Sequence, residues 1–204
     1  MEEVLSAVVG KKAPNFVAKA VMPDNEIEFD FDLENYADGK KLVLFFYPLN
    51  FTFVCPSELI AFHNRLGEFA SLNTKVVAVS IDSHFAHLAW KHMHHSKGGI
   101  GNVQFPMVSD LNKDISFDYG VLNDEGIAMR GTFIIDENFV IRHMHINDLP
   151  LGRNVDEVIR IIHAMDHHRE YGEVCPAGWN VGKDAMTASS DGVAGYLASN
   201  ADKL

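Results

Sequence analysis

The chain has 204 residues, of which 47% are apolar and 22% charged, the composition of an ordinary globular protein. Its formal charge of −11 argues against nucleic acid or an anionic membrane surface as a partner. No apolar run reaches the roughly 20 residues of a membrane span. The acidic start, Met1 to Glu3, lacks the basic region of a signal peptide. We therefore expect a cytoplasmic protein that contacts neither membrane nor nucleic acid.

Apolar periodicity and turn residues predict alternating strands and helices along the chain. The predicted strands cover residues 26–33 (half-exposed), 41–47 and 75–81 (buried), 105–108 (short), and a hairpin of 131–136 with 139–145. The predicted helices cover residues 56–70, 84–95 and 154–171, the last ended by Gly172. This order predicts an α/β protein in which helices flank a mixed central sheet, as in the thioredoxin fold. We expect residues 1–172 to form this domain and 173–204 to form a C-terminal arm with one weak helix near residues 192–200.

Cys55 lies between a predicted buried strand and a predicted amphipathic helix, directly before Pro56. Proline suits the first helical turn because its missing N–H has no partner there anyway. Unpaired backbone N–H groups and the helix dipole favour an anion at this end. The position therefore favours the thiolate, which is the reactive form of cysteine. The alternative is that Cys55 is an inert, buried side chain that caps a core helix.

Three further residues can act together with the Cys55 sulfur. The hydroxyl of Thr52 can donate to, or accept from, a group bound at the sulfur, although Thr52 also suits a simple cap. Pro48 ends the preceding strand and can form a rigid pocket wall. Arg130 directly precedes the strand at 131–135, where it is either a solvated arginine at the sheet rim or a guanidinium that stabilises the thiolate and orients an oxygen substrate.

The number and spacing of the cysteines exclude several kinds of site. Cys55 and Cys175 are the only two cysteines, too few for a disulfide scaffold or a four-thiolate zinc site, and they do not form a Cys-x-x-Cys pair. Eight of the eleven histidines cluster near residues 92–95, 143–145 and 163–168, but they show no metal-ligand pattern, and we expect no metal site. A Cys–His hydrolase needs a positioned imidazole, and His63 lies two predicted turns away from Cys55.

Residues 46–58, Phe-Tyr-Pro-Leu-Asn-Phe-Thr-Phe-Val-Cys-Pro-Ser-Glu, resemble the Pro-x-x-x-Thr-x-x-Cys active-site signature of the peroxiredoxins. Residues 172–179, Gly-Glu-Val-Cys-Pro-Ala-Gly-Trp, resemble the resolving-cysteine motif of the typical two-cysteine class, which includes alkyl hydroperoxide reductase C and thioredoxin peroxidase. Residues 82–90, 98–101, 130–136 and 149–153 resemble further family segments, in family order. The resemblance therefore covers nearly the whole chain.

The resemblance implies a thiol peroxidase that reduces hydrogen peroxide and alkyl hydroperoxides and needs no cofactor. Cys55 would be the peroxidatic cysteine, which becomes a sulfenic acid. Cys175, supplied by the partner chain of an antiparallel homodimer, would be the resolving cysteine that converts it to a disulfide. The resemblance also implies a thioredoxin-like dithiol protein as reductant and a decamer of five dimers.

The family likeness implies a role for five more side chains. Thr52 and Arg130 would hold the peroxide oxygens, and Pro48 would shield the pocket from water. Glu58 and Arg153 match positions that support the arginine.

Two other functions stay open at this point. A holdase chaperone is one, because rings of this family can assemble further and expose apolar surface. A disulfide oxidoreductase acting on proteins is the other, and the missing Cys-x-x-Cys pair argues against it.

Overall fold

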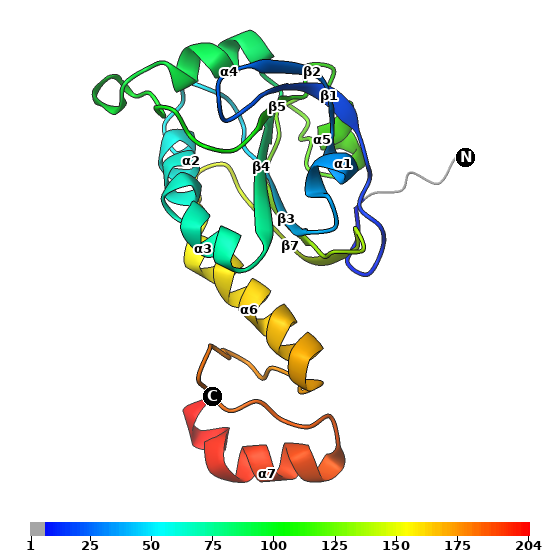
Figure 1. Cartoon of the computed structure of the whole chain (residues 1–204). Helices are drawn as coiled ribbons and strands as arrows, with labels where there is room; N and C mark the ends of the chain where they lie inside the picture. The colour runs from blue at the N-terminus through cyan, green and yellow to red at the C-terminus, as the bar shows by residue number, and fades with distance from the viewer. Residues whose placement is uncertain (1–6) are drawn as a thin grey trace. The chain divides into compact units, whose positions relative to one another are not determined.

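The computed structural model describes residues 7–204 (Figure 1), so the acidic start at residues 1–3 lies outside the described part. The elements, in chain order, are β1 (Val17–Val21), β2 (Ile27–Asp32), α1 (Leu33–Ala37), β3 (Lys41–Phe46), α2 (Cys55–Asn64), α3 (Leu66–Ser71), β4 (Thr74–Ser80), α4 (His84–Lys91), η1 (His95–Lys97), β5 (Met107–Ser109), α5 (Asp114–Asp118), β6 (Arg130–Ile135), β7 (Ile141–Asn147), α6 (Val155–Tyr171), α7 (Ser190–Asn200) and η2 (Ala201–Lys203).

One seven-stranded sheet runs in the order β2-β1-β5-β4-β3-β6-β7. The β3–β4 and β4–β5 pairs are parallel, and the other four pairs are antiparallel. The parallel pairs need crossover helices, whereas β6 and β7 join through a tight turn at Glu137 and Asn138. The predicted mixed sheet is therefore confirmed.

The central strand β3 explains why its sequence is continuously apolar. Leu42, Leu44 and Phe46 belong to the hydrophobic core that also contains residues of α1 and α5. Phe45 points the other way and stacks on Phe62 of α2, with 4.2 Å between ring centroids. Figure 1 shows α2 and α3 on one side of β3 and β4, and α1 and α5 on the other. A strand covered on both faces carries apolar residues at every position instead of alternating ones.

Several predicted boundaries differ from the structure. The predicted helix 56–70 is two helices, because Arg65 leaves helical geometry (φ −104°, ψ 7°) and ends α2 while starting α3. The glycine at 67 weakens the helix just after this break. The helix predicted at 84–95 ends at Lys91. The strand predicted at 105–108 corresponds to β5, which starts two residues later than predicted, at Met107.

Besides the short 3₁₀ helices η1 and η2, the elements β1, α1 and α5 were not predicted. The carboxylate of Asp110 accepts hydrogen bonds from the backbone N–H groups of Ile115 (3.0 Å) and Ser116 (2.7 Å) at the start of α5. Strand β1 pairs with β2 on one side and with β5 on the other. Both elements are held by partners outside the segment itself, which a local pattern does not reveal.

The chain divides into two compact units, with the division after Val155. In the second unit, the segment after Gly172 folds back along α6. Arg160 of α6 donates to the Trp179 carbonyl (2.8 Å), and the rings of His167 and Trp179 lie 4.8 Å apart. These contacts group α6 with the segment that follows it. Gly172 ends α6 in the left-handed conformation (φ +70°), as predicted, and α7 includes the predicted weak helix.

Within residues 7–204, none of the helices has the length and apolar character needed to span a membrane.

Candidate active site

Cys55 is the first residue of α2, and a loop of residues 47–54 joins it to the end of β3. Pro56 occupies the first helical turn, as the sequence predicts. The Cys55 side chain has no exposed surface. The sulfur therefore sits at a helix N-terminus, where the backbone favours negative charge, and it is shielded from bulk solvent.

Two side chains donate hydrogen bonds to this sulfur. The hydroxyl of Thr52 lies 3.0 Å from Cys55 Sγ, and Arg130 Nη1 lies 3.4 Å from it. Thr52 Oγ1 also lies 2.8 Å from the carbonyl oxygen of Leu49. Since a hydroxyl has one hydrogen, Thr52 donates either to the sulfur or to the carbonyl at any moment. A thiolate at Cys55 draws that hydrogen to itself.

Arg130 is only 4% exposed, so the interpretation as a solvated rim arginine is wrong. Its Nε donates to the Leu149 carbonyl (2.7 Å), and its Nη1 donates to Glu58 Oε2 (2.7 Å) as well as to the sulfur. Two fixed acceptors thus hold the guanidinium in place beside Cys55. A guanidinium held in this way keeps its geometry when an oxygen ligand arrives.

Glu58 and Arg153, predicted as supporting residues, complete the cluster. Glu58 Oε1 accepts from the backbone N (3.0 Å) and Nε (2.9 Å) of Arg153, and Oε2 accepts from Arg153 Nη2 (2.9 Å). Arg153 Nη1 donates to the carbonyl oxygens of Phe46 (2.7 Å) and Gly131 (2.9 Å). The buried guanidinium also lies 5.0 Å from the ring centroid of Phe45. Burial lowers the pKa of Arg153, and the charge of Glu58 opposes that effect.

The net charge of this cluster favours a thiolate. Arg130 and Arg153 bring two positive charges, Glu58 brings one negative charge, and all three are buried. The cluster therefore carries one net positive charge, which is costly away from water. A thiolate at Cys55 neutralises it and accepts the Arg130 hydrogen bond. Electrostatics and the helix N-terminus therefore act in the same direction.

Pro48 is buried in the same loop, two residues after the end of β3.

Beneath the loop, the structure adds residues that the sequence did not single out. Asn50, Tyr47 and His87 form a buried hydrogen-bonded network. The sequence signals for it were the family-like stretches 46–58, which contains Tyr47 and Asn50, and 82–90, which contains His87.

Cys175 lies in the second unit, after the end of α6, and is partly buried. Its Sγ lies 3.6 Å from the carbonyl oxygen of Ala164, to which the thiol can donate. Burial raises the pKa of Cys175, as does the charge of Glu173, whereas the charge of Arg160 lowers it. The net direction is upward, so the structure favours the protonated thiol here.

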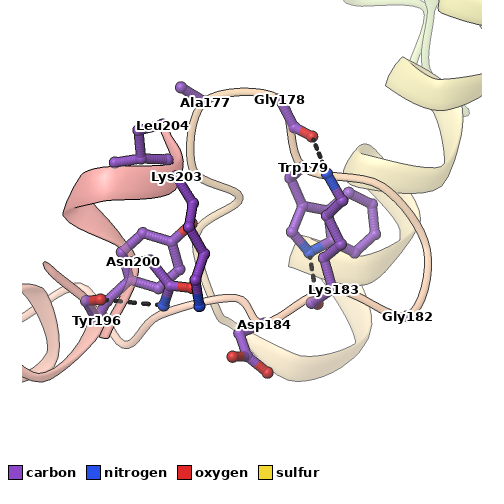
Figure 2. A pocket seen from close by; sticks show the side chains of 10 residues that line it. All are labelled: Ala177, Gly178, Trp179, Gly182, Lys183, Asp184, Tyr196, Asn200, Lys203 and Leu204. Carbon is purple, nitrogen blue, oxygen red and sulfur yellow. Dashed lines mark hydrogen bonds between the residues drawn. The ribbon is translucent and has the colours of Figure 1, made fainter. Parts of the chain in front are cut away.

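The second unit also contains a hollow of about 460 Å³ (Figure 2). Its walls include Trp179, Lys183, Tyr196 and Lys203, and the indole N–H of Trp179 donates to the Lys183 carbonyl (3.1 Å). Neither cysteine lines this hollow. Among residues 7–204, no three His, Cys, Asp or Glu side chains are grouped so that they could hold a metal ion.

The chain is similar to known families, proteins and solved structures. Residues 9–144 match the AhpC/TSA family, and residues 164–199 match the C-terminal domain of 1-Cys peroxiredoxin. Alkyl hydroperoxide reductase C of Buchnera aphidicola subsp. Acyrthosiphon pisum is 50% identical over 192 residues, which cover 94% of this chain and 98% of that protein. Peroxiredoxin-1 of Gallus gallus is 51% identical over 181 residues, which cover 88% of this chain and 90% of that protein. The crystal structure of the reduced 2-Cys peroxiredoxin of Plasmodium vivax matches with a TM-score of 0.90 and 47% identity, covering 93% of this chain and 98% of that one.

Proposed function

Because the chain belongs to the AhpC/TSA family and is a two-cysteine peroxiredoxin, a thiol-dependent peroxidase, we propose that Cys55 is its peroxidatic cysteine and Cys175 its resolving cysteine. The main support is the environment of the Cys55 sulfur. It meets two hydrogen-bond donors, a helix N-terminus and a buried cluster with one unbalanced positive charge. Among the described residues, 7–204, no comparable cluster of donors surrounds Cys175.

In the first step, the Cys55 thiolate attacks one peroxide oxygen and the O–O bond breaks. The sulfur becomes a sulfenic acid, and the other oxygen leaves as water or an alcohol after it takes up a proton. Thr52 and Arg130 can turn their donors from the sulfur towards the peroxide oxygens, where negative charge develops as the bond breaks. Pro48 shields this space from water. Hydrogen peroxide and alkyl hydroperoxides share the reacting O–O group and are the proposed substrates.

In the second step, the Cys175 thiol attacks the sulfur of the Cys55 sulfenic acid, so that a disulfide forms and water leaves. The raised pKa of Cys175 means that its proton must be lost during this step. Cys55 has no exposed surface, so the first turn of α2 must open to let a second sulfur reach it. We propose that Cys175 comes from the partner chain of a homodimer, with five dimers in a decamer.

A thioredoxin-like dithiol protein is the proposed reductant, because the disulfide must be returned to two thiols for turnover. A reducing compartment supplies such proteins, which supports the cytoplasm as the location. In functional terms we divide the chain into a peroxidase domain, residues 1–172, and an arm that carries the resolving cysteine, residues 173–204. The holdase alternative has no support from the related proteins, and we do not retain it.

The test uses electrophoresis without reductant after one equivalent of peroxide is added. The wild type should give a disulfide-linked dimer, and both Cys55→Ser and Cys175→Ser should lose it. A mixture of the two variants distinguishes partner-chain from same-chain pairing. Refolded together, they should regain a dimer band with one disulfide. A wild-type disulfide confined to the monomer band would refute the partner-chain arrangement, and peroxide consumption by Cys55→Ser would refute the role of Cys55.

A further inference from the structure

The loop that carries Thr52 contains a strained residue. Phe51 has a φ of +57°, in the left-handed region that bulky side chains seldom adopt. Such a conformation persists only where surrounding contacts enforce it. The ring of Phe51 packs on Trp90, with 5.6 Å between centroids. Asn50 directly precedes Phe51 in the chain.

Asn50 is fixed by three hydrogen bonds. Its backbone N–H donates to Asp82 Oδ2 (2.9 Å), its Oδ1 accepts from the Tyr47 hydroxyl (2.8 Å), and its Nδ2 lies 3.0 Å from His87 Nδ1. Tyr47 and His87 have no exposed surface, and Asn50 is 5% exposed. The Asn50 side chain and the peptide between residues 49 and 50, directly before Phe51, therefore have little freedom to rotate.

The carbonyl of Val108 determines which ring nitrogen of His87 carries the hydrogen. His87 Nε2 is 3.1 Å from this carbonyl, which can only accept, so Nε2 carries the hydrogen. In a neutral ring, Nδ1 is then an acceptor, and it receives the Asn50 amide hydrogen. Burial lowers the pKa of His87 to about 4, and this keeps the ring neutral. The charge of Asp82 opposes this effect, whereas His84 and Lys91 add to it.

We propose that Asn50 and His87 are positioning residues for the peroxidase reaction. The neutral His87 ring holds the Asn50 side chain, and Asn50 holds Phe51 in its left-handed conformation. Thr52 follows directly, so its hydroxyl stays 3.0 Å from Cys55 Sγ. Without these hydrogen bonds, Phe51 relaxes to a negative φ and the Thr52 hydroxyl moves away from the sulfur. The assignment rests on the proposed roles of Cys55 and Thr52.

A double-mutant cycle tests this coupling. Asn50→Leu keeps the approximate shape of the side chain but removes both of its hydrogen bonds, and Thr52→Val removes the hydroxyl. In single-turnover reactions with hydrogen peroxide, we expect Asn50→Leu to slow the oxidation of Cys55 by about tenfold in the wild-type background. In the Thr52→Val background it should cause no further loss, because the group that it positions is absent. Equal losses in both backgrounds would overturn the proposal.

A second variant guards against misfolding of Asn50→Leu. Asn50→Asp keeps an acceptor for Tyr47 but places a carboxylate opposite His87 Nδ1, which then takes up a proton. We expect Asn50→Asp to recover most of the rate that Asn50→Leu loses, and its His87 to become charged. Failure of Asn50→Asp to recover that rate would count against the proposal.

Nitrogen-15 NMR of His87 reads the network directly and needs no peroxidase activity. In the wild type, Nε2 should carry the hydrogen and Nδ1 should stay unprotonated from about pH 5 to about pH 8. A hydrogen on Nδ1 of wild-type His87 would refute the positioning roles and leave the role of Cys55 intact. Loss of the Cys55 role would appear separately, as peroxide consumption by Cys55→Ser.

Discussion

The buried carboxylate of Glu58 gives the sharpest prediction. In Glu58→Gln, one side-chain oxygen is replaced by an NH₂ group, which faces the donors of Arg130 and Arg153 instead of accepting from them. The carboxylate accepts four hydrogen bonds of 2.7–3.0 Å from these two arginines. The amide keeps an acceptor for about two of them and turns the others into donor–donor contacts. Losing one partner of a buried ion pair costs about 3–5 kcal/mol of unfolding free energy.

The same substitution should make the Cys55 thiol more reactive. The cluster then holds two guanidinium groups and no carboxylate, so a thiolate at Cys55 becomes the only anion available to balance them. We therefore expect lower stability together with faster alkylation of Cys55 by iodoacetamide at about pH 6. Opposite changes in stability and reactivity distinguish this electrostatic effect from general loosening of the fold.

Urea unfolding at one protein concentration, followed by tryptophan fluorescence, measures the first quantity. Glu68→Gln is a matched control, because Glu68 forms an exposed ion pair with Arg65 (2.6 Å), and such pairs contribute at most about 1 kcal/mol. A Glu58→Gln protein as stable as Glu68→Gln, or one whose Cys55 is alkylated more slowly than in the wild type, would refute the charge argument.

Three further predictions concern the site, the sheet and the buried histidine. Thr52→Val should slow peroxide oxidation of the Cys55 thiol by about 100-fold in single-turnover kinetics, because a displaced or missing group at the reacting atoms costs that much in rate. Thr52→Ser keeps the hydroxyl and should keep most of the rate. Equal losses of rate in both variants would contradict a role for the hydroxyl. Gly131→Ala should lower the unfolding free energy in urea by about 1–3 kcal/mol, because its Cβ would lie 2.6 Å from Val121 Cγ1. Gly67→Ala, on an open helical surface, should instead raise it by about 0.5–1 kcal/mol, and a shared sign would contradict the packing argument. His87 has a pKa of about 4 in the folded protein and about 6.5 in the unfolded chain. Between these pH values the unfolded chain binds more protons than the folded protein. The free energy of unfolding therefore falls as the pH is lowered from about 6.5 to about 4, by about 3 kcal/mol in total. Urea unfolding of His87→Gln from about pH 7 to about pH 4 should lack this component, and a slope equal to the wild type would exclude His87 as its source.

Local chemistry was sufficient to predict much of the fold and the position of the candidate nucleophile. The apolar run of β3, the proline after Cys55 and the glycine that ends α6 each act through near neighbours in the chain. Apolar periodicity and helix termini depend on interactions within a few residues, which is why they are visible in the sequence. Short elements held by distant partners, such as β1 and α5, were not predicted for the same reason.

The charge balance around the sulfur depended on tertiary structure. Arg130 could have been a solvated rim residue, and only its burial beside Glu58 excludes that. Glu58 and Arg153 are 95 residues apart in the chain, yet two side-chain hydrogen bonds of 2.9 Å join them. The neutral ring of His87 likewise follows from the Val108 carbonyl opposite it. A sequence lists which charges and donors exist, but their effect on one another depends on distance and burial, and these are settled only when the chain folds.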